Sequence, residues 1–264
     1  MNQQDKNQIL AKAFIKVGDF KTAEELIGIQ QDTLHIPILD QFITKNSQCL
    51  AIKEKIKILR GFPKISVLIS GATGTGKELL ARALARTEES FYPVNCAGLT
   101  AELFCSEVFG NVPGSYTGAR GAKGILEEAG DGVVFFDEIG ELPKEVQSKL
   151  LRTIQFNKVR PVGAVRDKDI SCRFVFATHQ NIKESLREDF YYRIAQVVLE
   201  VPPLAHREFE DTILIANRLM GYPISEGRIQ QLQFFYDSQC PGNIRGLQNM
   251  ILNWKLFEDK VPVL

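Results

Sequence analysis

The chain has 264 residues, of which 44% are hydrophobic and 24% charged, so it is long enough to bury a substantial core. Lys plus Arg and Asp plus Glu both number 32, and this balance gives no electrostatic footprint for nucleic acid or an anionic membrane. The chain starts with polar residues, and no apolar run approaches the roughly 20 residues that span a bilayer; the sequence predicts a cytoplasmic protein without a signal peptide or membrane helix.

Residues 5–28 carry apolar side chains at helical spacing, with an interruption at Gly18 and Asp19. This pattern predicts two short helices joined by a turn, within an N-terminal helical segment over residues 1–35. One helical pair cannot bury its own apolar face. We therefore expect it to pack on the rest of the chain or on a partner.

After Pro37 short apolar strands alternate with helices. Strands are predicted at 67–70, 133–136, 174–177 and 197–201, and helices at 77–87 and 144–155. This alternation implies an α/β subdomain over residues 36–203, with a parallel sheet flanked by helices. Beyond it, helical patterns at 208–220, 225–237 and 243–257 predict a smaller all-helical subdomain over residues 204–264.

The segment GATGTGKE lies between a predicted strand and a predicted helix. Its glycines let the backbone curl round a pyrophosphate, the helix adds the positive end of its dipole, and Lys77 supplies a cation for the β and γ phosphates. The sequence therefore predicts ATP binding by Gly71, Ala72, Thr73, Gly74, Thr75, Gly76, Lys77, Glu78 and Leu79. Glu78 stands where a Ser or Thr usually holds Mg²⁺, so Thr75 is the nearest alternative hydroxyl. A glycine-rich turn without a ligand is the competing interpretation.

Asp137 and Glu138 end the predicted strand in GVVFFDEIGELP. In open α/β sheets, ligands bind at the carboxyl ends of strands. Asp137 is expected to hold Mg²⁺, directly or through water, and Glu138 to polarise the water that attacks the γ phosphate. The alternative is a surface turn with two solvated acids, which is weaker after an apolar strand and downstream of a phosphate loop.

Seven motifs in order resemble one family. They are GATGTGKE, VNCAGL, GSYTGA, FFDEIGELP, LREDFYYRI, VPPLAHRE and CPGNIRGLQN. Together they resemble the central ATPase domain of bacterial sigma-54-dependent activators, the enhancer-binding branch of the AAA+ proteins. The resemblance covers about residues 36–258 and implies a P-loop core followed by a helical lid.

The resemblance implies roles for polar residues at two further strand ends. Asn95 is similar to an asparagine that holds the catalytic glutamate in an inactive pose; the alternative is a strand-end amide that caps a turn. Thr178 corresponds to a sensor of the nucleotide. His179 stands where the family usually has asparagine, and it is read as a polar substitute rather than a metal ligand, since no second ligand lies at a useful spacing.

Three arginines also match family positions. Arg187 and Arg193 resemble arginine fingers that enter the nucleotide site of the adjacent subunit, which implies a ring; solvated helix-face charges are the alternative. Arg245 resembles the lid arginine that contacts nucleotide in its own subunit. The chain departs from the family at Cys240, usually tryptophan, and at Gly246, usually glutamate.

The segment GSYTGA resembles GAFTGA, the tip of the loop that grips the sigma factor. The implied sigma contacts are Gly114, Ser115, Tyr116, Thr117, Gly118 and Ala119. Tyr116 would present a ring and Thr117 a hydroxyl to the partner, with the glycines giving a mobile tip.

The predicted function is that of a ring-forming ATPase that uses ATP and Mg²⁺ to remodel sigma-54 RNA polymerase holoenzyme. Two alternatives remain open: an AAA+ ATPase that remodels another protein, and a regulatory ATP-binding scaffold without turnover. The family usually adds a sensory domain and a helix-turn-helix domain, and neither is evident in this sequence.

Overall fold

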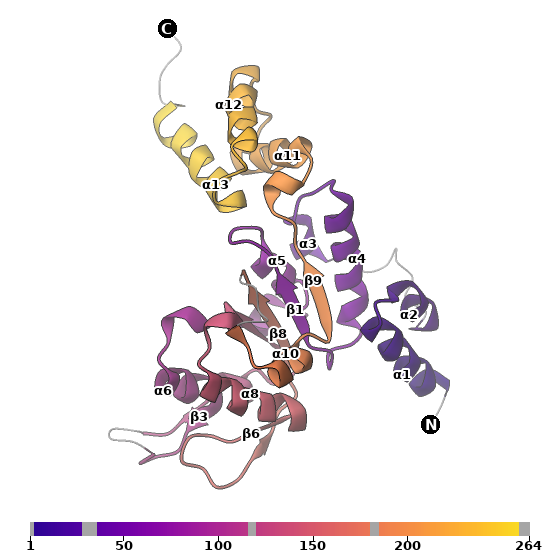
Figure 1. Cartoon of the computed structure of the whole chain (residues 1–264), viewed down its shortest axis with the longest axis vertical. Coiled ribbons are helices and arrows are strands. Elements are labelled where there is room, and N and C mark those ends of the chain that lie inside the picture. Colours follow the sequence, from indigo (N-terminus) through magenta and orange to yellow (C-terminus); the bar gives the residue numbers. More distant parts are fainter. Residues whose placement is uncertain (1–2, 28–35, 116–119, 180–184, 259–264) are drawn as a thin grey trace.

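The computed structural model describes residues 3–27, 36–115, 120–179 and 185–258. Its centre is a sheet of five parallel strands in the order β2-β5-β8-β1-β9 (Figure 1). The strands are β1 Val67–Ser70, β2 Phe91–Asn95, β5 Val133–Asp137, β8 Arg173–Thr178 and β9 Val197–Glu200. The parallel sheet and the four strands predicted from apolar runs are confirmed, within one residue at each end.

Alternating side chains of the strands divide the core into two layers. Val67 and Ile69 join a cluster with helices α4 (Ser47–Arg60) and α5 (Lys77–Arg82), whereas Leu68 faces the other layer. That second layer contains α6 (Ala101–Phe104), α7 (Ile125–Glu128), α8 (Lys144–Phe156) and α10 (Glu188–Ile194). The sheet is therefore covered by helices on both faces, as the alternating pattern of the sequence predicted.

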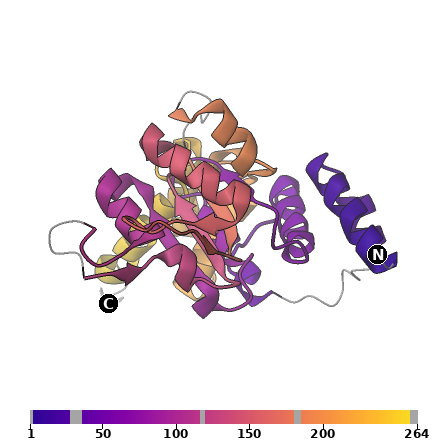
Figure 2. The same cartoon turned by 90° about the horizontal axis from the view of Figure 1, so that it is seen from below.

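The predicted N-terminal pair of helices is confirmed as α1 (Gln3–Lys16) and α2 (Phe20–Ile27). Ala11, Ile15 and Ala23 are buried and belong to the same cluster as the core side of α4. Figure 2 shows this pair beside α4 at one side of the molecule. The pair thus buries its apolar face against the rest of the chain, as expected.

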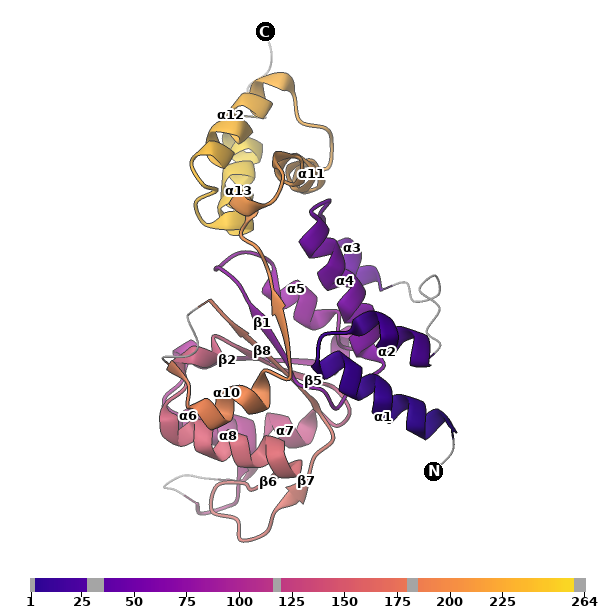
Figure 3. The ribbon, with the colours of Figure 1, turned by 45° about the vertical axis from the view of Figure 1, so that its right-hand side comes forward.

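Three helices after β9 form a bundle with its own core. They are α11 (Phe209–Met220), α12 (Glu226–Asp237) and α13 (Asn243–Asn253), and a π-helical turn at Trp254–Glu258 follows. Ile215, Leu232 and Leu247 are among the residues that pack inside the bundle. Figure 3 shows the bundle at one end of the molecule, connected to the sheet by the segment after β9. This confirms the predicted helical lid; its boundary at residues 203 and 204 stays a prediction.

Two small hairpins lie at the end of the molecule opposite the bundle (Figures 1 and 3). One pairs β3 (Gly110–Asn111) with β4 (Ala122–Lys123), and the other pairs β6 (Lys158–Val159) with β7 (Lys168–Asp169). The N–H of Val112 donates to the carbonyl of Val162 at 3.0 Å, and the N–H of Val162 donates to that of Gly110 at 2.8 Å. The hairpins are therefore joined through their backbones.

Two local features differ from the sequence-based expectation. Helix α5 ends at Arg82 rather than Thr87, because the chain tightens there: the N–H of Ala85 donates to the carbonyl of Arg82 at 3.0 Å. A short helix α3 (Pro37–Asp40) precedes α4, and neither was assigned from the sequence. Within the described ranges, no helix has the length and apolar character that a membrane crossing requires.

Candidate functional site

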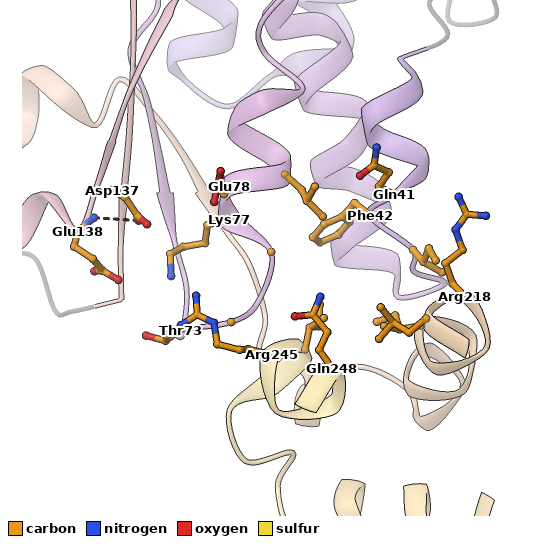
Figure 4. Close-up of a pocket in the computed structure, with 17 residues that line it drawn as sticks. Gln41, Phe42, Thr73, Lys77, Glu78, Asp137, Glu138, Arg218, Arg245 and Gln248 are labelled. Carbon is orange, nitrogen blue, oxygen red and sulfur yellow. Dashed lines mark hydrogen bonds between the residues drawn. The ribbon is translucent and has the colours of Figure 1, made fainter. Parts of the chain in front are cut away.

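A cavity of about 280 Å³ lies between the sheet and the helical bundle. Figure 4 shows its lining converging from four parts of the chain. The residues around it are Gln41, Phe42 and Ile43 before α4; Thr73, Gly74, Gly76, Lys77, Glu78 and Leu79 of the phosphate loop; Asp137 and Glu138 after β5; and Ile215, Arg218, Leu219, Ile244, Arg245 and Gln248 of the bundle. The phosphate loop and the acidic strand end predicted from the sequence therefore share one cavity.

The phosphate loop depends on glycine at two positions. Gly74 has φ of +77° and Gly76 has φ of +96°, both in the left-handed region that side chains disfavour. A Cβ on Gly74 would lie 2.5 Å from the carbonyl oxygen of Gly242, and one on Gly76 would lie 3.0 Å from the ring of Phe42. The loop thus fits against both the bundle and the cavity wall only with glycine in these places.

Lys77 begins α5 and is buried, with 7% of its surface exposed. Its Nζ donates to the carbonyls of Gly71 at 2.8 Å and Ala72 at 3.2 Å. Burial lowers the pKa of Lys77, and the nearby Glu138 and Asp137 carboxylates oppose this shift. The ammonium group is held inside the curl of the loop, where it can meet an incoming phosphate.

Thr75 and Glu78 are both engaged within the protein. The buried Thr75 hydroxyl donates to the Ala72 carbonyl at 2.8 Å, so it braces the loop and does not line the cavity. The Glu78 carboxylate accepts from Arg82 at 2.7 and 3.0 Å along the exposed face of α5. For Thr75 to hold Mg²⁺, as predicted, its hydroxyl would have to turn away from Ala72.

Asp137 and Glu138 meet the loop from the end of β5. The Oδ1 of Asp137 accepts from the N–H of Glu138 at 3.1 Å, and Glu138 has a left-handed backbone with φ of 54°. Burial raises the pKa of Asp137, the neighbouring Glu138 charge adds to the rise, and Lys77 opposes it. A carboxylate left partly desolvated beside a phosphate site is a suitable ligand for a hard cation, because Mg²⁺ takes one or two carboxylates together with substrate phosphates.

The sensor residues lie beside these acids at the end of β8. Thr178 is fully buried, and its carbonyl accepts from the N–H of Gly71 at 3.2 Å, which ties the sensor strand to the start of the phosphate loop. His179 contacts the Glu138 carboxylate through both its main-chain N–H, at 3.3 Å, and its Nδ1. The structure thus places His179, which the sequence marked only as a departure from the family, against the predicted catalytic glutamate.

Asn95 ends β2 on the other side of β5. Its Oδ1 accepts from the N–H of Ala97 at 3.0 Å and caps the 3₁₀ turn at Cys96–Gly98. This is the turn-capping arrangement that the sequence left open as an alternative. Among the hydrogen bonds of the described residues, none joins Asn95 to Glu138, and its switch role stays a prediction.

The helical bundle contacts the phosphate loop directly. The N–H of Ile244 donates to the carbonyl of Gly74 at 3.0 Å, and the Nδ2 of Asn243 donates to that of Thr73, also at 3.0 Å. Arg245 follows on the same helix, and in Figure 4 its side chain extends towards Lys77. Its charge contributes to the lowered pKa of Lys77. A nucleotide phosphate between these two cations would relieve their repulsion.

Arg207 and Phe42 are part of the site and were missed from the sequence. The Arg207 guanidinium is buried and donates to the carbonyls of Thr75 at 3.0 Å and Pro202 at 3.1 and 3.2 Å. It also lies over the ring of Phe42, which lines the cavity. Arg207 falls inside the quoted VPPLAHRE motif, so the motif marked the position without indicating its role.

The two predicted finger arginines lie away from the cavity of their own chain. Arg187 immediately precedes α10, and its guanidinium binds the Asp189 carboxylate at 2.8 and 3.0 Å and the Ser148 hydroxyl at 2.8 Å. Arg193 donates to the carbonyls of Ile154 at 3.0 Å and Gln155 at 3.5 Å, at the end of α8. Arg187 is the more accessible of the two, since Arg193 is bound to backbone.

Gly114 and Ser115 of the GSYTGA segment lie on the β3–β4 hairpin. The N–H of Ser115 donates to the carbonyl of Val112 at 3.2 Å. Tyr116, Thr117, Gly118 and Ala119, the other predicted sigma contacts, lie outside the described residues. The hairpin that carries the segment is at the far end of the molecule from the cavity (Figure 1).

A phosphate loop between β1 and a helix, paired acids at the end of β5 in the same sheet and a helical bundle over the cavity define a P-loop ATPase domain of the AAA+ class. The sequence matches the Sigma-54 interaction domain family over residues 42–200. The chain belongs to this family. The matched region includes the phosphate loop, both acids, His179 and the two finger candidates, and it excludes α1, α2 and the helical bundle.

Named relatives and solved structures agree with this assignment. The chain is 37% identical over 229 residues to the transcriptional regulatory protein GlrR of Escherichia coli (strain K12), covering 80% of this chain and 51% of GlrR. It is 35% identical over 233 residues to the response regulator protein PilR of Pseudomonas aeruginosa, covering 81% and 52%. The crystal structure of NtrX from Brucella abortus in complex with ATP superposes with a TM-score of 0.69 at 25% identity, covering 91% of this chain and 57% of NtrX. The chain thus spans about half the length of the relatives that it matches.

Proposed function

We propose that the protein is an ATP-hydrolysing, ring-forming activator that remodels sigma-54 RNA polymerase through the loop carrying GSYTGA. The observation that carries the proposal is the convergence of Lys77, Asp137, Glu138 and Arg245 on one cavity. Membership of the Sigma-54 interaction domain family supports the target, and the ATP complex of NtrX supports the nucleotide. Residues 1–35, 36–203 and 204–264 are proposed as an N-terminal segment, a nucleotide-binding subdomain and a lid, in a cytoplasmic bacterial protein.

The residues divide the chemistry of hydrolysis between them. The loop amides and Lys77 bind the phosphates, while Arg245 contacts them from the lid. Glu138 accepts a proton from the attacking water, and Thr178 and His179 border the position of the γ phosphate. Phe42 and Ile43, with Ile215 and Leu219 of the bundle, form the apolar part of the cavity that suits a nucleotide base.

Mg²⁺ would be held by Asp137, directly or through water, together with the phosphates of the substrate. Asp137 fits this role, because its partly desolvated carboxylate lines the same cavity as the phosphate loop. When bound, the cation would neutralise charge on the phosphates. Thr75 is the further candidate ligand, provided that its bond to Ala72 opens.

Hydrolysis is proposed to need a neighbouring subunit, because Arg187 and Arg193 do not line the cavity of their own chain. An arginine supplied in trans to the transferring phosphate is worth roughly 10³–10⁵ in rate. Nucleotide turnover and ring assembly would then be coupled. Arg187 is the better candidate to reach a neighbour, since it is exposed and its partners are side chains, the exposed Asp189 and the half-buried Ser148.

An AAA+ ATPase that remodels a different protein is the second candidate. The substitutions Ser115, Tyr116 and His179 favour it, since they alter the two segments that would read the target and the γ phosphate. Both candidates require the same ATPase chemistry. They differ only in what the hairpin loop contacts.

One pair of variants tests the ATPase assignment and also the scaffold alternative. We expect Lys77→Ala to abolish ATP binding, because the loop amides alone leave the β and γ charges poorly neutralised. We expect Glu138→Gln to retain binding and to lose turnover. Calorimetric titration with ATP and phosphate-release assays separate the two defects. Undiminished hydrolysis by Glu138→Gln would exclude Glu138 as the base, and no hydrolysis by assembled wild-type rings would favour the scaffold.

A second experiment tests the target. Wild-type protein with ATP hydrolysis arrested by a γ-phosphate transition-state analogue should form a stable complex with sigma-54. Thr117→Ala should lose this complex and keep basal hydrolysis, and Tyr116→Phe, the matched control, should retain both. If rings hydrolyse ATP but neither the wild type nor the Ser115→Ala, Tyr116→Phe double variant binds sigma-54, the second candidate function replaces the first.

A further inference from the structure

Glu138 lies between two strands that could each supply a polar partner. In the register of the sheet, β2 places Asn95 opposite Asp137 on one side of β5. On the other side β8 runs alongside β5 and ends in Thr178, and His179 follows it. The glutamate can therefore be held from either side.

The observed contacts are on the β8 side. The Oε2 of Glu138 receives the main-chain N–H of His179 at 3.3 Å and also contacts the imidazole Nδ1. An ionised carboxylate only accepts hydrogen bonds, so Nδ1 must carry the hydrogen in this pair. The Glu138 side chain is 18% exposed and that of His179 is 41% exposed, so the contact lies at the edge of the cavity.

No hydrogen bond between described residues joins the Asn95 amide to Glu138. The Oδ1 of Asn95 is used by the N–H of Ala97, in a bond of 3.0 Å that caps a turn. A strand-end amide engaged in this way is a local structural cap. Asn95 at the end of β2 thus caps a turn, and His179 after β8 contacts Glu138.

We propose that His179 restrains the Glu138 carboxylate between turnovers, in place of Asn95. This inference rests on the proposed hydrolysis of ATP with Glu138 as the base. A carboxylate oxygen that receives two N–H groups is held towards the end of β8. Glu138 acts on water only after the imidazole contact opens. His179 is therefore a positioning residue that acts through Glu138.

The rate of phosphate release in four proteins tests the restraint. His179→Ala removes the imidazole donor, and we expect kcat to rise about tenfold, the effect of one hydrogen bond to a charged group, with KM for ATP unchanged. His179→Asn places an amide N–H where Nδ1 lies and should stay near the wild-type rate. Asn95→Ala, on the other side of β5, is the competing variant: if Asn95 restrains Glu138 instead, kcat rises in Asn95→Ala and not in His179→Ala. An unchanged or lower kcat in His179→Ala, or the tenfold rise in Asn95→Ala instead, would overturn the proposal.

A second measurement does not depend on turnover. The sequence has three histidines, so protein labelled with ¹⁵N-histidine gives few imidazole signals, and His179→Asn assigns the one in question. We expect a slowly exchanging Nδ1-bound hydrogen on His179 in the wild type and in Asn95→Ala, and its loss in Glu138→Ala. Persistence of that hydrogen in Glu138→Ala would refute the contact. If wild-type rings release no phosphate, the proposed function fails, and this spectrum still decides whether His179 holds Glu138.

Discussion

The guanidinium of Arg207 lies over the ring of Phe42, with 5.2 Å between its central carbon and the ring centroid. This separation is within the range of a cation–π interaction. Phe42 belongs to the segment before α4 and Arg207 to the segment after β9, while the same guanidinium also bonds the carbonyl of Thr75. One buried side chain therefore joins the cavity wall, the phosphate loop and the start of the lid.

Replacing Arg207 should destabilise the protein and disturb the loop. We expect Arg207→Met to lower the free energy of unfolding by about 2–4 kcal/mol, because buried carbonyls lose a charged donor. Arg207→Lys should lie in between, since an ammonium group cannot reproduce the planar fork. Urea denaturation measures both. Arg166→Ala, at an exposed arginine of the β6–β7 hairpin, is the control and should stay near the wild type; an equal loss there would refute the assignment.

A methyl group on Gly74 should separate the loop from the bundle. The φ of +77° and the 2.5 Å approach of the Gly242 carbonyl leave no room for a Cβ. We expect Gly74→Ala to fold less stably and to bind ATP at least tenfold more weakly, as measured by calorimetry. Gly98→Ala is the matched control, because a Cβ there meets nothing within 4 Å. Normal ATP affinity in Gly74→Ala would show that the contact with the bundle is dispensable.

Asp137 should make the nucleotide-free protein less stable at neutral pH. Burial raises its pKa above 3.8, so the folded state binds the proton more tightly than the unfolded chain. The resulting stabilisation is present below pH 3.8 and is lost as the pH rises through the raised pKa. Asp137→Asn should therefore increase the urea midpoint at pH 7 and have less effect as the pH approaches 4. Asp169→Asn, at an aspartate whose side chain is 87% exposed, should change neither value.

The two finger candidates should differ in their effects. Arg187→Ala removes an exposed side chain, so stability should be nearly unchanged while turnover in rings falls by about 10³ or more. Arg193→Ala should in addition cost about 1–2 kcal/mol of stability, because the Ile154 carbonyl loses its donor. Calorimetric melting and phosphate release measure the two effects.

Mixing experiments test whether either arginine acts in trans. Rings that combine Glu138→Gln with Arg187→Ala subunits should regain some turnover, since some interfaces then pair an intact pocket with an intact finger. The same holds for Glu138→Gln with Arg193→Ala. Rings shown to be mixed, yet inactive at every ratio, would contradict fingers that act across the subunit boundary.

The sequence predicted the four strands that contain continuous apolar runs. β1, β5 and β8 are buried parallel strands and β9 is a half-buried parallel strand at the edge, and each contains a continuous run of apolar residues. β2 escaped prediction because Pro93 interrupts it; the strand tolerates proline because it lies at the edge of the sheet. The two hairpins escaped because their paired strands are only two residues long.

At the site, the spacing of residues within motifs predicted Lys77 and Glu138, whereas residues that pack in or against the cavity wall were missed. Lys77 and Glu138 belong to motifs in which residue type and spacing follow from phosphate chemistry. Phe42 and Arg207 come from segments that meet only after folding, so no local pattern marks Phe42, and the VPPLAHRE motif contains Arg207 without indicating its contacts. The contact of His179 with Glu138 has the same origin, since the two residues follow the ends of two strands and are 41 positions apart in the chain.

The backbone bonds between the two hairpins have a mechanical consequence. Val162 contributes both its N–H and its carbonyl to the link, so neither hairpin moves far without the other. The second hairpin begins directly after α8, a helix of 13 residues and hence about 20 Å, which starts a few residues beyond Glu138. If α8 tilts at its N-terminal end, near Glu138, its C-terminal end moves both hairpins together. The helix then acts as a lever arm between the site and the hairpins.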